Sequence, residues 1–211
     1  MGFYDQMSNI DDNSIVRCPK SNLFYTGLSK RILDLVIVIV ALPFISVVWV
    51  LLFFGIKIIL RQHLIFRQNR VGMNGKVFTI YKFRTYSESG TSKNVNRVTK
   101  KIFRFIRASH IDELPQVINV LCAHMSVVGP RPYTSEECEV LTEQVPYFGL
   151  RHAVKPGLTG MAQIFYTHEN SGEHALRKIH YDLEYVDKIG FIFDLRIIVK
   201  TFIELVKMRG I

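Results

Sequence analysis

The chain has 211 residues, with 27 Lys and Arg against 18 Asp and Glu and a formal net charge of +9. This length suits one domain with its own core and an additional element, and the positive charge favours anionic partners such as nucleic acid, phosphorylated small molecules or the inner face of a membrane. The three cysteines, Cys18, Cys122 and Cys138, have no metal-ligand spacing, which argues against a disulfide scaffold or a metal finger and for a reducing compartment.

Residues 1–29 show no interpretable pattern and are expected to form an N-terminal tail. The strongest signal follows at residues 35–56, a run of 22 residues without a charge. At about 1.5 Å per residue it would form a helix of roughly 33 Å, long enough to cross the hydrocarbon core of a bilayer. The run starts too late for a signal peptide, and no small-residue cleavage site follows it. We therefore expect a membrane helix over residues 30–60.

The residues leave open how this helix meets the membrane. Basic side chains stand on both flanks, at Lys30, Arg31, Lys57 and Arg61, so the positive-inside rule favours neither orientation. Pro43 lies inside the run, where it removes one backbone hydrogen bond and favours a kink. The chain either enters and leaves on the cytoplasmic side as a kinked, re-entrant hairpin or crosses once with a mild kink.

A β-hairpin is predicted after the membrane helix. Residues 64–67 and 76–83 have apolar side chains at alternate positions, and Asn74-Gly75 lies between them. The hairpin is expected to bring four cations into one neighbourhood, namely Arg67, Arg70, Lys82 and Arg84. A solvated basic face is the simpler interpretation, but the clustering of these cations at strand ends favours an anion-binding site.

Two further helices are predicted to be amphipathic. Residues 93–107 carry six positive charges and no acid, with Val98, Ile102, Phe105 and Ile106 at helical spacing. A second apolar stripe near the C-terminus consists of Phe191, Leu195, Ile198, Phe202 and Leu205. Each helix either lies on an anionic membrane surface or packs on the domain core, with core packing somewhat favoured for the second.

The adjacent carboxylates Asp112 and Glu113 have two interpretations. As a helix start, Asp112 is a good N-cap, Glu113 favours the first turn and Pro115 is tolerated there. As chemistry, a carboxylate pair can hold Mg²⁺ for a phosphate-rich substrate, or a carboxylate can attack phosphorus and form an acyl-phosphate. Capping explains the pattern in isolation, and the surrounding cations favour chemistry.

Two loops rich in Pro and Gly, at residues 128–133 and 155–160, are expected to hold neighbouring cations in defined places. Arg131 stands between two prolines and has little backbone freedom. A guanidinium held in this way suits bidentate contact with a phosphate, although a rigid structural turn explains each loop equally well.

Taken together, these stretches resemble the bacterial sugar transferase family, the monotopic phosphoglycosyl transferases. The matching stretches occur in the family's order: "KRILDLVIVIVALP", "FRQNRVGMNGKVFTIYKFRT", "IDELPQVINVL", "MSVVGPRP" and "KPGLTGMAQI". Weaker matches in "HYDLEYV" and "FDLRIIVKT" extend the similarity to about Thr201. We therefore expect a helix-dominated α+β fold in which a kinked re-entrant membrane helix (residues 30–60), a small β-hairpin and amphipathic interfacial helices surround one cytoplasmic catalytic domain (residues 61–211).

The resemblance implies transfer of sugar-1-phosphate from a UDP-sugar to polyprenyl phosphate, with release of UMP and with Mg²⁺ as cofactor. This is the first membrane step in the assembly of a surface glycan such as exopolysaccharide, capsule, O-antigen or glycoprotein. It makes Asp112 the nucleophile, carrying a covalent phospho-sugar intermediate, and a metal ligand; Glu113 supports catalysis, and Pro43 forms the kink of the membrane helix. Phosphate or nucleotide contacts are expected from Lys82, Arg84, Arg107 and Arg131.

By the same resemblance, the expected location is the bacterial inner membrane, with the catalytic domain on the cytoplasmic face and membrane lipid around it. The sequence leaves open whether the chain is a monomer or a homodimer. The chain departs from the family pattern at four places. Ala123-His124 replaces the usual Gly-Asp, His110 and Asn69 replace a common serine and glutamate, and residues 165–174 lack the usual motif. These departures leave the sugar specificity open.

Two other functions compete with this one. A catalytically silent membrane adaptor of glycan assembly would use the basic surface, and the missing acid before Met125 favours it slightly. The intact Asp112-Glu113 pair argues against it. A membrane-tethered nucleic-acid binder ranks last, because the chain has no recognition motif and no aromatic platform for bases, so no nucleic-acid partner is expected.

Overall fold

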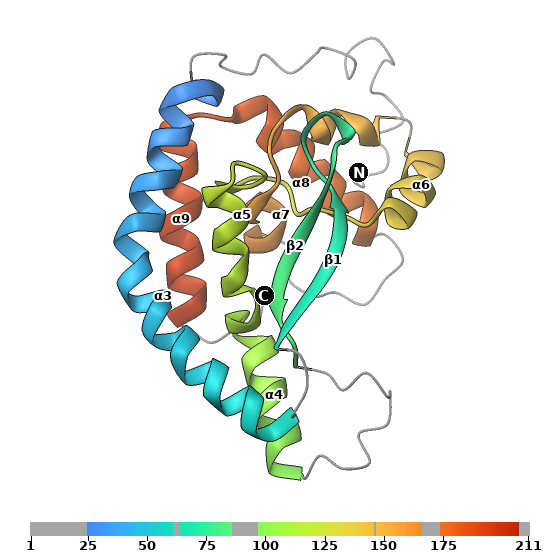
Figure 1. Ribbon diagram of the computed structural model, residues 1–211. Coiled ribbons are helices and arrows are strands. Elements are labelled where there is room, and N and C mark those ends of the chain that lie inside the picture. The colour runs from blue at the N-terminus through green and yellow to red at the C-terminus, as the bar shows by residue number, and fades with distance from the viewer. Residues whose placement is uncertain (1–24, 61–63, 86–96, 146, 166–173, 207–211) are drawn as a thin grey trace.

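The computed structural model describes residues 25–60, 64–85, 97–145, 147–165 and 174–206. The elements, in chain order, are a helical turn Tyr25–Ser29, α3 (Lys30–Leu60), β1 (Ile65–Val71), a 3₁₀ turn Met73–Gly75, β2 (Val77–Phe83), α4 (Arg97–Ala108), a 3₁₀ helix Ile111–Gln116, α5 (Val117–Leu121), β3 (Ser126–Val128), α6 (Ser135–Gln144), a 3₁₀ helix Phe148–Ala153, β4 (Gly157–Thr159), α7 (Met161–Phe165), α8 (His174–Lys188) and α9 (Phe191–Val206) (Figure 1). Helices dominate and the predicted hairpin is present, as expected, and β3 and β4 form a second small sheet that was not predicted. Of the expected tail, residues 1–24 lie outside the described residues, as do residues 166–173 of the unusual stretch.

The apolar run forms α3, and its bounds agree with the predicted membrane helix. In the described part of the chain, Tyr25–Gly55 is the one segment long and apolar enough to cross a membrane, with a mean hydropathy of 3.1 over its most apolar window. The helix continues through Pro43, whose carbonyl accepts a hydrogen bond from Ser46 Oγ at 2.8 Å. The predicted kink and re-entrant path remain predictions.

Polar contacts fix the N-terminal end of α3 to the globular part. Lys30 is buried and forms an ion pair with the buried Asp194 of α9, which also accepts from Tyr25 Oη at 2.7 Å and from Tyr185 Oη at 2.8 Å. One turn further along α3, Asp34 accepts hydrogen bonds from Ser126 and Val127 of β3. The apolar helix α3 carries buried charges at one end and is thus fixed in register with the globular part.

The second half of α3 packs against the same globular part. The Trp49 ring meets the Phe83 ring of β2 edge to face, with centroids 6.1 Å apart. Leu52 joins the cluster that Phe83 forms with two buried side chains of α4, Phe103 and Ile106. Both halves of α3 therefore contact one body, and Figure 1 shows the helix curving along its side.

The predicted hairpin is confirmed, with a first strand that extends to Val71. β1 and β2 pair antiparallel, and the turn between them places Asn74 at φ 56° and Gly75 at φ 73°, the left-handed region that Asn-Gly turns favour. The register pairs Arg67 with Tyr81, and Phe66 with Lys82.

This register corrects the predicted cluster of four cations. Paired residues share one face of an antiparallel ladder, and faces alternate along each strand. Lys82 and Arg70 therefore lie on one face, while Arg67 lies on the other, beside Tyr81. The expectation of a single neighbourhood was wrong for Arg67, because the strand period of two separates it from Arg70.

The two Pro- and Gly-rich loops meet each other in the fold. β3 and β4 pair in parallel; β3 continues into the first loop, and β4 is formed by Gly157–Thr159 of the second. Gly129 N donates to Thr159 O at 2.9 Å, and Gly157 N donates to Pro130 O at 3.0 Å. A Cβ on Gly157 would lie 2.1 Å from the backbone nitrogen of Gly129, so this approach requires glycine.

Asp34 anchors β3 to the membrane helix. Its Oδ1 accepts from Ser126 Oγ and from Val127 N, both at 2.9 Å, and all three residues are buried. Because β3 leads directly into the loop that carries Arg131, α3 helps to determine where that loop lies.

Both predicted amphipathic helices are present, with changed faces. In α4 the buried side chains are Phe103 and Ile106, while Ile102 and Phe105 of the predicted stripe are exposed. In α9 the core face consists of Asp194 and Ile197, with Ile198 partly buried against the core. The other members of the predicted α9 stripe, Phe191, Leu195, Phe202 and Leu205, are exposed. Most of the C-terminal stripe therefore does not pack on the core, contrary to the favoured interpretation.

Candidate active site

The two carboxylates lie in the 3₁₀ helix Ile111–Gln116, called the dyad helix below. The residue before it, His110, adopts a left-handed conformation with φ 53° and forms the N-cap without a side-chain cap bond. Asp112 is inside the helix, so the capping interpretation of Asp112 was wrong. The left-handed residue ends α4 and turns the chain, which presents the carboxylates to the hairpin.

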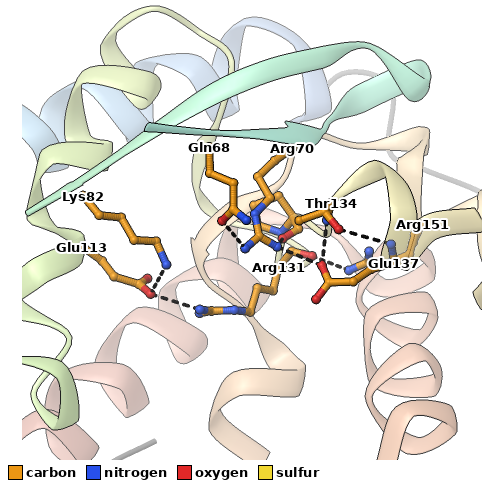
Figure 2. Close-up of polar contacts among 9 residues, drawn as sticks. Gln68, Arg70, Lys82, Glu113, Arg131, Thr134, Glu137 and Arg151 are labelled. Atoms are coloured by element: carbon orange, nitrogen blue, oxygen red, sulfur yellow. Dashed lines mark hydrogen bonds and ion pairs between the residues drawn. The ribbon is translucent and has the colours of Figure 1, made fainter. Parts of the chain in front are cut away.

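Glu113 is the centre of the polar contacts at this site. Its Oε1 accepts from Lys82 Nζ at 2.8 Å and from Arg131 Nη2 at 3.0 Å, and Figure 2 shows both cations pointing at this carboxylate. His110 Nδ1 lies 3.9 Å from the same oxygen. Burial alone would raise the pKa of Glu113, but the adjacent His110 and the charges of Arg131 and Lys82 hold that pKa well below its usual range. Glu113 is therefore ionised.

Asp112 has a different environment from its neighbour. It is half-buried, and in the described part of the chain no other side chain forms an ion pair with its carboxylate. Burial, followed by repulsion from Glu113, raises the pKa of Asp112 above its usual range. Of the two carboxylates, Glu113 pairs with two cations through Oε1, whereas Asp112 is available for a ligand or for reaction.

The loop that carries Arg131 (residues 129–134, the Arg131 loop) is held through its backbone. Arg151 Nη2 donates to the carbonyl of Arg131 at 2.6 Å, and Arg70 Nη1 donates to the carbonyl of Pro132 at 3.2 Å. Val71 N donates to the carbonyl of Tyr133 at 2.9 Å. Three successive carbonyls thus have donors from other elements, which fixes the direction of the Arg131 side chain (Figure 2).

Arg151 itself is a buried cation with a buried partner. Its guanidinium lies against the ring of Tyr133, with Cζ 4.4 Å from the centroid, and its Nη2 lies 2.6 Å from Asp182 Oδ2. Both residues of this pair are only 2% exposed. A charge pair this deeply buried is stable only when it is fully hydrogen-bonded, and the carbonyl of Arg131 completes the bonding.

Arg70 extends the cationic surface beside Arg131. It pairs with Glu137 Oε2 at 3.0 Å and with Gln68 Oε1 at 2.7 Å, and burial lowers its pKa despite the Glu137 charge. Glu137 also closes a capping box with Thr134 at the start of α6. The Arg131 loop, β1 and α6 are therefore tied together at Arg70.

The structure brings four of the predicted site residues together, namely Asp112, Glu113, Lys82 and Arg131. It does not bring Arg84 and Arg107 into the ion pairs of Glu113: Arg84 N donates to Leu64 O where the hairpin opens, and Arg107 Nη1 donates to Thr85 O at 3.0 Å. Their predicted phosphate contacts remain predictions.

Sequence reasoning did not find the supporting shell of Arg151, Asp182 and Gln68, and it considered Arg70 only as part of the hairpin cluster. Arg151 and Asp182 are 31 residues apart in the chain and belong to no local pattern. The one available signal was the aromatic and basic composition around Tyr133 and Phe148, whose rings both contact the Arg151 guanidinium.

The departures from the family pattern have distinct places in the fold. Ala123 adopts φ 62°, a conformation that favours the glycine usual there. His124 is exposed beside the Phe78 ring, with centroids 6.0 Å apart, and is not among the contacts of Glu113. Asn69 accepts from its cross-strand partner Thr79 at 3.0 Å. Of the two histidines considered, His110 alone borders the dyad.

The carboxylates of this site fit a magnesium ion only if the phosphates of a substrate supply further ligands. Within the described residues, no group of three or more His, Cys, Asp or Glu side chains that could hold a metal comes together. Mg²⁺ is usually held by one or two carboxylates and by substrate phosphates, not by an all-protein cage. Asp112, which forms no ion pair with the other residues that the structure describes, is the residue suited to this role.

Comparison with known proteins identifies the family to which the sequence is similar. The profile of the family described as "Bacterial sugar transferase" matches residues 25–208. A UDP-glucose:undecaprenyl-phosphate glucose-1-phosphate transferase of Escherichia coli K12 is 36% identical over 182 residues, which cover 82% of this chain and 39% of that protein. An Aeromonas hydrophila UDP-N-acetylgalactosamine-undecaprenyl-phosphate N-acetylgalactosaminephosphotransferase is 32% identical over 179 residues, covering 82% and 42% of the two chains.

A shorter relative matches along nearly its whole length. The uncharacterised sugar transferase EpsL of Bacillus subtilis 168 is 38% identical over 190 residues, which cover 86% of this chain and 89% of EpsL. By contrast, the chain spans about two fifths of the length of the Escherichia coli and Aeromonas relatives. The family profile covers the membrane helix, the hairpin, the dyad helix and the Arg131 loop together. The chain therefore belongs to the bacterial sugar transferase family.

Proposed function

We propose that this chain transfers a sugar-1-phosphate from a UDP-sugar to a polyprenyl phosphate at a membrane surface. The observation that carries the proposal is the junction of Lys82 and Arg131 on Glu113, beside an Asp112 carboxylate that has no such partner. The cations suit the phosphates of a nucleotide donor, and the free carboxylate suits the role of nucleophile. The names of the family relatives supply the donor and acceptor classes.

The proposed reaction has two steps. In the first, an Asp112 Oδ atom attacks the phosphorus attached to the sugar, the bond from that phosphorus to the bridging oxygen breaks, and UMP leaves with the electron pair. In the second, an oxygen of the polyprenyl phosphate attacks the same phosphorus, and the acyl-phosphate bond breaks to restore the Asp112 carboxylate. Division into two steps lets the site bind donor and acceptor in turn.

Each residue of the site has a role in this scheme. Arg131 and Lys82 lie where they can neutralise the charge on the transferred phosphoryl group and on the leaving UMP. Glu113 holds those two cations in place. The raised pKa of Asp112 gives a more basic, more nucleophilic carboxylate than an exposed aspartate. Asp112 would also hold Mg²⁺ with the diphosphate of the donor, and the ion would supply charge neutralisation to the phosphates.

We further propose that α3 enters and leaves the membrane on one side. If the chain crossed once, its two flanks would lie on opposite faces of the bilayer. Instead, Lys30 at one end and Trp49 and Leu52 in the second half pack on the same globular part. This packing supports a re-entrant helix, a globular part on the cytoplasmic face, and a position at the inner membrane.

Exposed apolar side chains mark the surface that would meet the lipid. Such side chains stand out along α3, α4 and α9: Ile39, Val40, Phe44, Val47, Leu51, Ile102, Phe105, Ile192, Leu195 and Phe202. Isolated exposed apolar residues are normal, but so many on long helices are not normal for a surface in water. The two amphipathic helices therefore suit an interfacial position.

The test follows nucleotide release from a panel of UDP-sugars, with polyprenyl phosphate and Mg²⁺ and with the full-length chain in detergent. We expect UMP from one donor and its loss in Asp112→Asn. The matched control is Asp187→Asn, at an exposed aspartate on α8. Without acceptor, intact-protein mass spectrometry should show a wild-type adduct of one sugar phosphate that is absent from Asp112→Asn.

Three outcomes would contradict the proposal. Release of UDP would indicate plain glycosyl transfer. Wild-type rates in Asp112→Asn would remove this residue from the chemistry. Absence of release from any UDP-sugar would favour the silent membrane adaptor, whose basic surface would then serve to recruit other proteins.

A further inference from the structure

A groove of about 460 Å³ lies between the second half of α3 and the hairpin. Trp49, Phe53 and Phe54 line it from α3, and Tyr81 and Phe83 line it from β2. We propose that this groove binds the first prenyl units of the acceptor, with its phosphate next to Arg67. This inference rests on the proposed function, because that function supplies the acceptor.

The groove reaches the dyad helix. Pro115 and Ile118 form part of its wall. In a 3₁₀ helix the side chains at positions i and i+3 lie above one another, so Asp112 stands on the same side of the dyad helix as Pro115. Glu113 stands about a third of a turn away, towards Lys82 and Arg131. An apolar chain in the groove therefore approaches Asp112 from the side that the cations of Glu113 do not occupy.

Arg67 distinguishes this groove from a simple apolar surface. Among the described residues that line it, only Arg67 carries a formal charge, and its Cζ lies 5.9 Å from the centre of the Tyr81 ring. The strand register puts Arg67 on the face of the hairpin opposite Lys82. The two faces of the hairpin thus offer separate cations to two anionic substrates. Lys82 would contact the phosphates of the UDP-sugar, and Arg67 would contact the phosphate of the polyprenyl acceptor.

The position of the groove favours a lipid with an anionic head over a soluble ligand. Val50 and Phe54 on its rim are 55% and 58% exposed and belong to the same apolar side of α3 that would meet the bilayer. A prenyl chain can enter from the membrane without passing through water. A phospholipid has the same access, but the second proposed step needs an acceptor phosphate oxygen near Asp112, so we assign the groove to polyprenyl phosphate.

In the proposed step, the bound phosphate donates an oxygen electron pair to the phosphorus carried by Asp112. A new phosphorus–oxygen bond forms, the acyl-phosphate bond breaks, and its electron pair returns to the Asp112 carboxylate. The product is the prenyl diphosphate sugar, and no oxidant or reductant is required. The side wall of aromatic and aliphatic residues keeps water from competing with the acceptor.

The first experiment is photolabelling of the wild-type chain in detergent with a polyprenyl phosphate that carries a diazirine on an early prenyl unit. Labelled peptides are identified by mass spectrometry. We expect labels within residues 49–54, 65–67, 81–83 or 115–118, and we expect excess polyprenyl phosphate to remove them. Labelling elsewhere would overturn the proposal, as would equal competition by phosphatidylglycerol or by the dephosphorylated polyprenol, which would indicate a general lipid site.

The second experiment uses variants in pairs. Val50→Trp fills the groove, and its control Val47→Trp adds the same ring at an exposed position on α3 that does not line it. Arg67→Gln removes the cation, and its control Arg196→Gln removes an exposed cation of α9. The readouts are the KM for polyprenyl phosphate and the acceptor-independent exchange of labelled UMP into the UDP-sugar.

We expect Arg67→Gln to raise the KM for polyprenyl phosphate about tenfold or more, since a charge-assisted contact contributes that much, and we expect Val50→Trp to raise it because the larger ring occupies the groove. UMP exchange should stay within about twofold, and both controls should behave as wild type. An unchanged KM for polyprenyl phosphate, or a loss of UMP exchange as large as the rise in that KM, would overturn the assignment of the groove to the acceptor. Photolabelling needs no turnover, so it decides the groove even if the wild type releases no UMP, a result that would contradict the proposed function alone.

Discussion

Lys82 Nζ lies 2.8 Å from Glu113 Oε1, and this contact joins the second strand of the hairpin to the helix that carries both carboxylates. Arg131 reaches the same oxygen from the far side of the site. Two cations from separate elements are therefore held by one oxygen atom, and each has further N–H groups that can donate hydrogen bonds to a phosphate. Glu113 therefore holds two cations in place beside Asp112.

Because they share one carboxylate oxygen, Lys82 and Arg131 should act as a unit. Lys82→Met and Arg131→Met should each lower kcat/KM for the UDP-sugar by about 10- to 100-fold, the usual contribution of a charge-assisted contact. The double variant should lose less than the product of the two factors. Initial rates of UMP release at low donor concentration measure this.

The control is Lys188→Met, which breaks the exposed i,i+4 pair with Glu184 on α8 and should change the rate little. If the two losses multiply independently, Lys82 and Arg131 do not act through Glu113. If neither variant loses activity, the cations do not contact the donor.

Variants of the buried pair of Arg151 and Asp182 should separate its contribution to folding stability from its role in positioning the Arg131 loop. Arg151→Met leaves Asp182 charged and buried without a partner, which costs about 3–5 kcal/mol and should lower the unfolding midpoint sharply. Arg151→Met/Asp182→Leu removes both charges and should recover most of that stability. Thermal unfolding in detergent measures both effects.

Activity should not recover with stability in the double variant. The carbonyl of Arg131 loses its donor in both variants, so the Arg131 loop is no longer held and the KM for the donor should stay raised. A double variant with wild-type stability and wild-type KM would show that Arg151 supports folding only. A matched surface change, Glu184→Gln, should affect neither quantity.

Local patterns predicted the hairpin and the long apolar helix well. Alternating apolar residues around Asn74-Gly75 indicate a hairpin because the turn needs two residues with positive φ. The register does not follow from that turn alone, and the register is what places Arg67 apart from Lys82. Sequence reasoning therefore grouped cations that the strand period separates.

Contacts between distant segments were beyond prediction for a different reason. Lys30 and Asp194 are 164 residues apart, and each appears in the sequence as an ordinary charge beside an apolar segment. Nothing local shows that either is buried. The same holds for Arg151 and Asp182, so the residues that hold the Arg131 loop became visible only in the fold. The capping interpretation of Asp112, one of the two that the sequence offered, failed because the left-handed conformation of His110 could not be foreseen.

Ala123→Gly should stabilise the chain. Ala123 has φ 62°, and an L-residue with a side chain pays about 1 kcal/mol or more for the left-handed conformation. Part of the gain is offset by the greater freedom of glycine in the unfolded chain, so we expect a net stabilisation of about 0.5–1 kcal/mol. Thermal unfolding in detergent checks this.

The matched control is Ala153→Gly, at an exposed helical alanine, which should destabilise the chain by a similar amount. A lower midpoint for Ala123→Gly would mean that the side chain at this position contributes contacts that outweigh the strain. In that case the departure from the family's glycine would be a compensated change.

His152 should make stability depend on pH. Burial, followed by the charge of Arg151, lowers the pKa of His152 to about 4 from its usual 6.5. Below pH 6.5 the unfolded chain takes up a proton that the folded chain does not accept until about pH 4. The contribution of His152 to stability is therefore lost as the pH falls from about 6.5 to about 4.

His152→Phe removes this titration and keeps a ring next to Phe148. Unfolding midpoints measured from pH 8 to pH 4 should show the variant losing less stability than the wild type across that interval. His180→Phe, at an exposed position of α8, serves as the control and should follow the wild type. Parallel curves for His152→Phe and the wild type would contradict the prediction.

The path of α3 through the membrane can be tested at its two ends. In a background without native cysteines, Leu28→Cys lies before α3 and Lys76→Cys lies at the tip of the hairpin, both at exposed positions. With a re-entrant helix, a membrane-impermeant thiol reagent should modify both cysteines from the cytoplasmic side of inverted vesicles and neither from the opposite side.

Pro43→Leu restores a backbone donor to α3 and favours a straight span, so part of that population should expose position 28 on the opposite side. Phe44→Leu, at the exposed neighbour of Pro43, should keep the wild-type pattern. Modification of the two cysteines from opposite sides, in the otherwise wild-type chain, would contradict the re-entrant proposal.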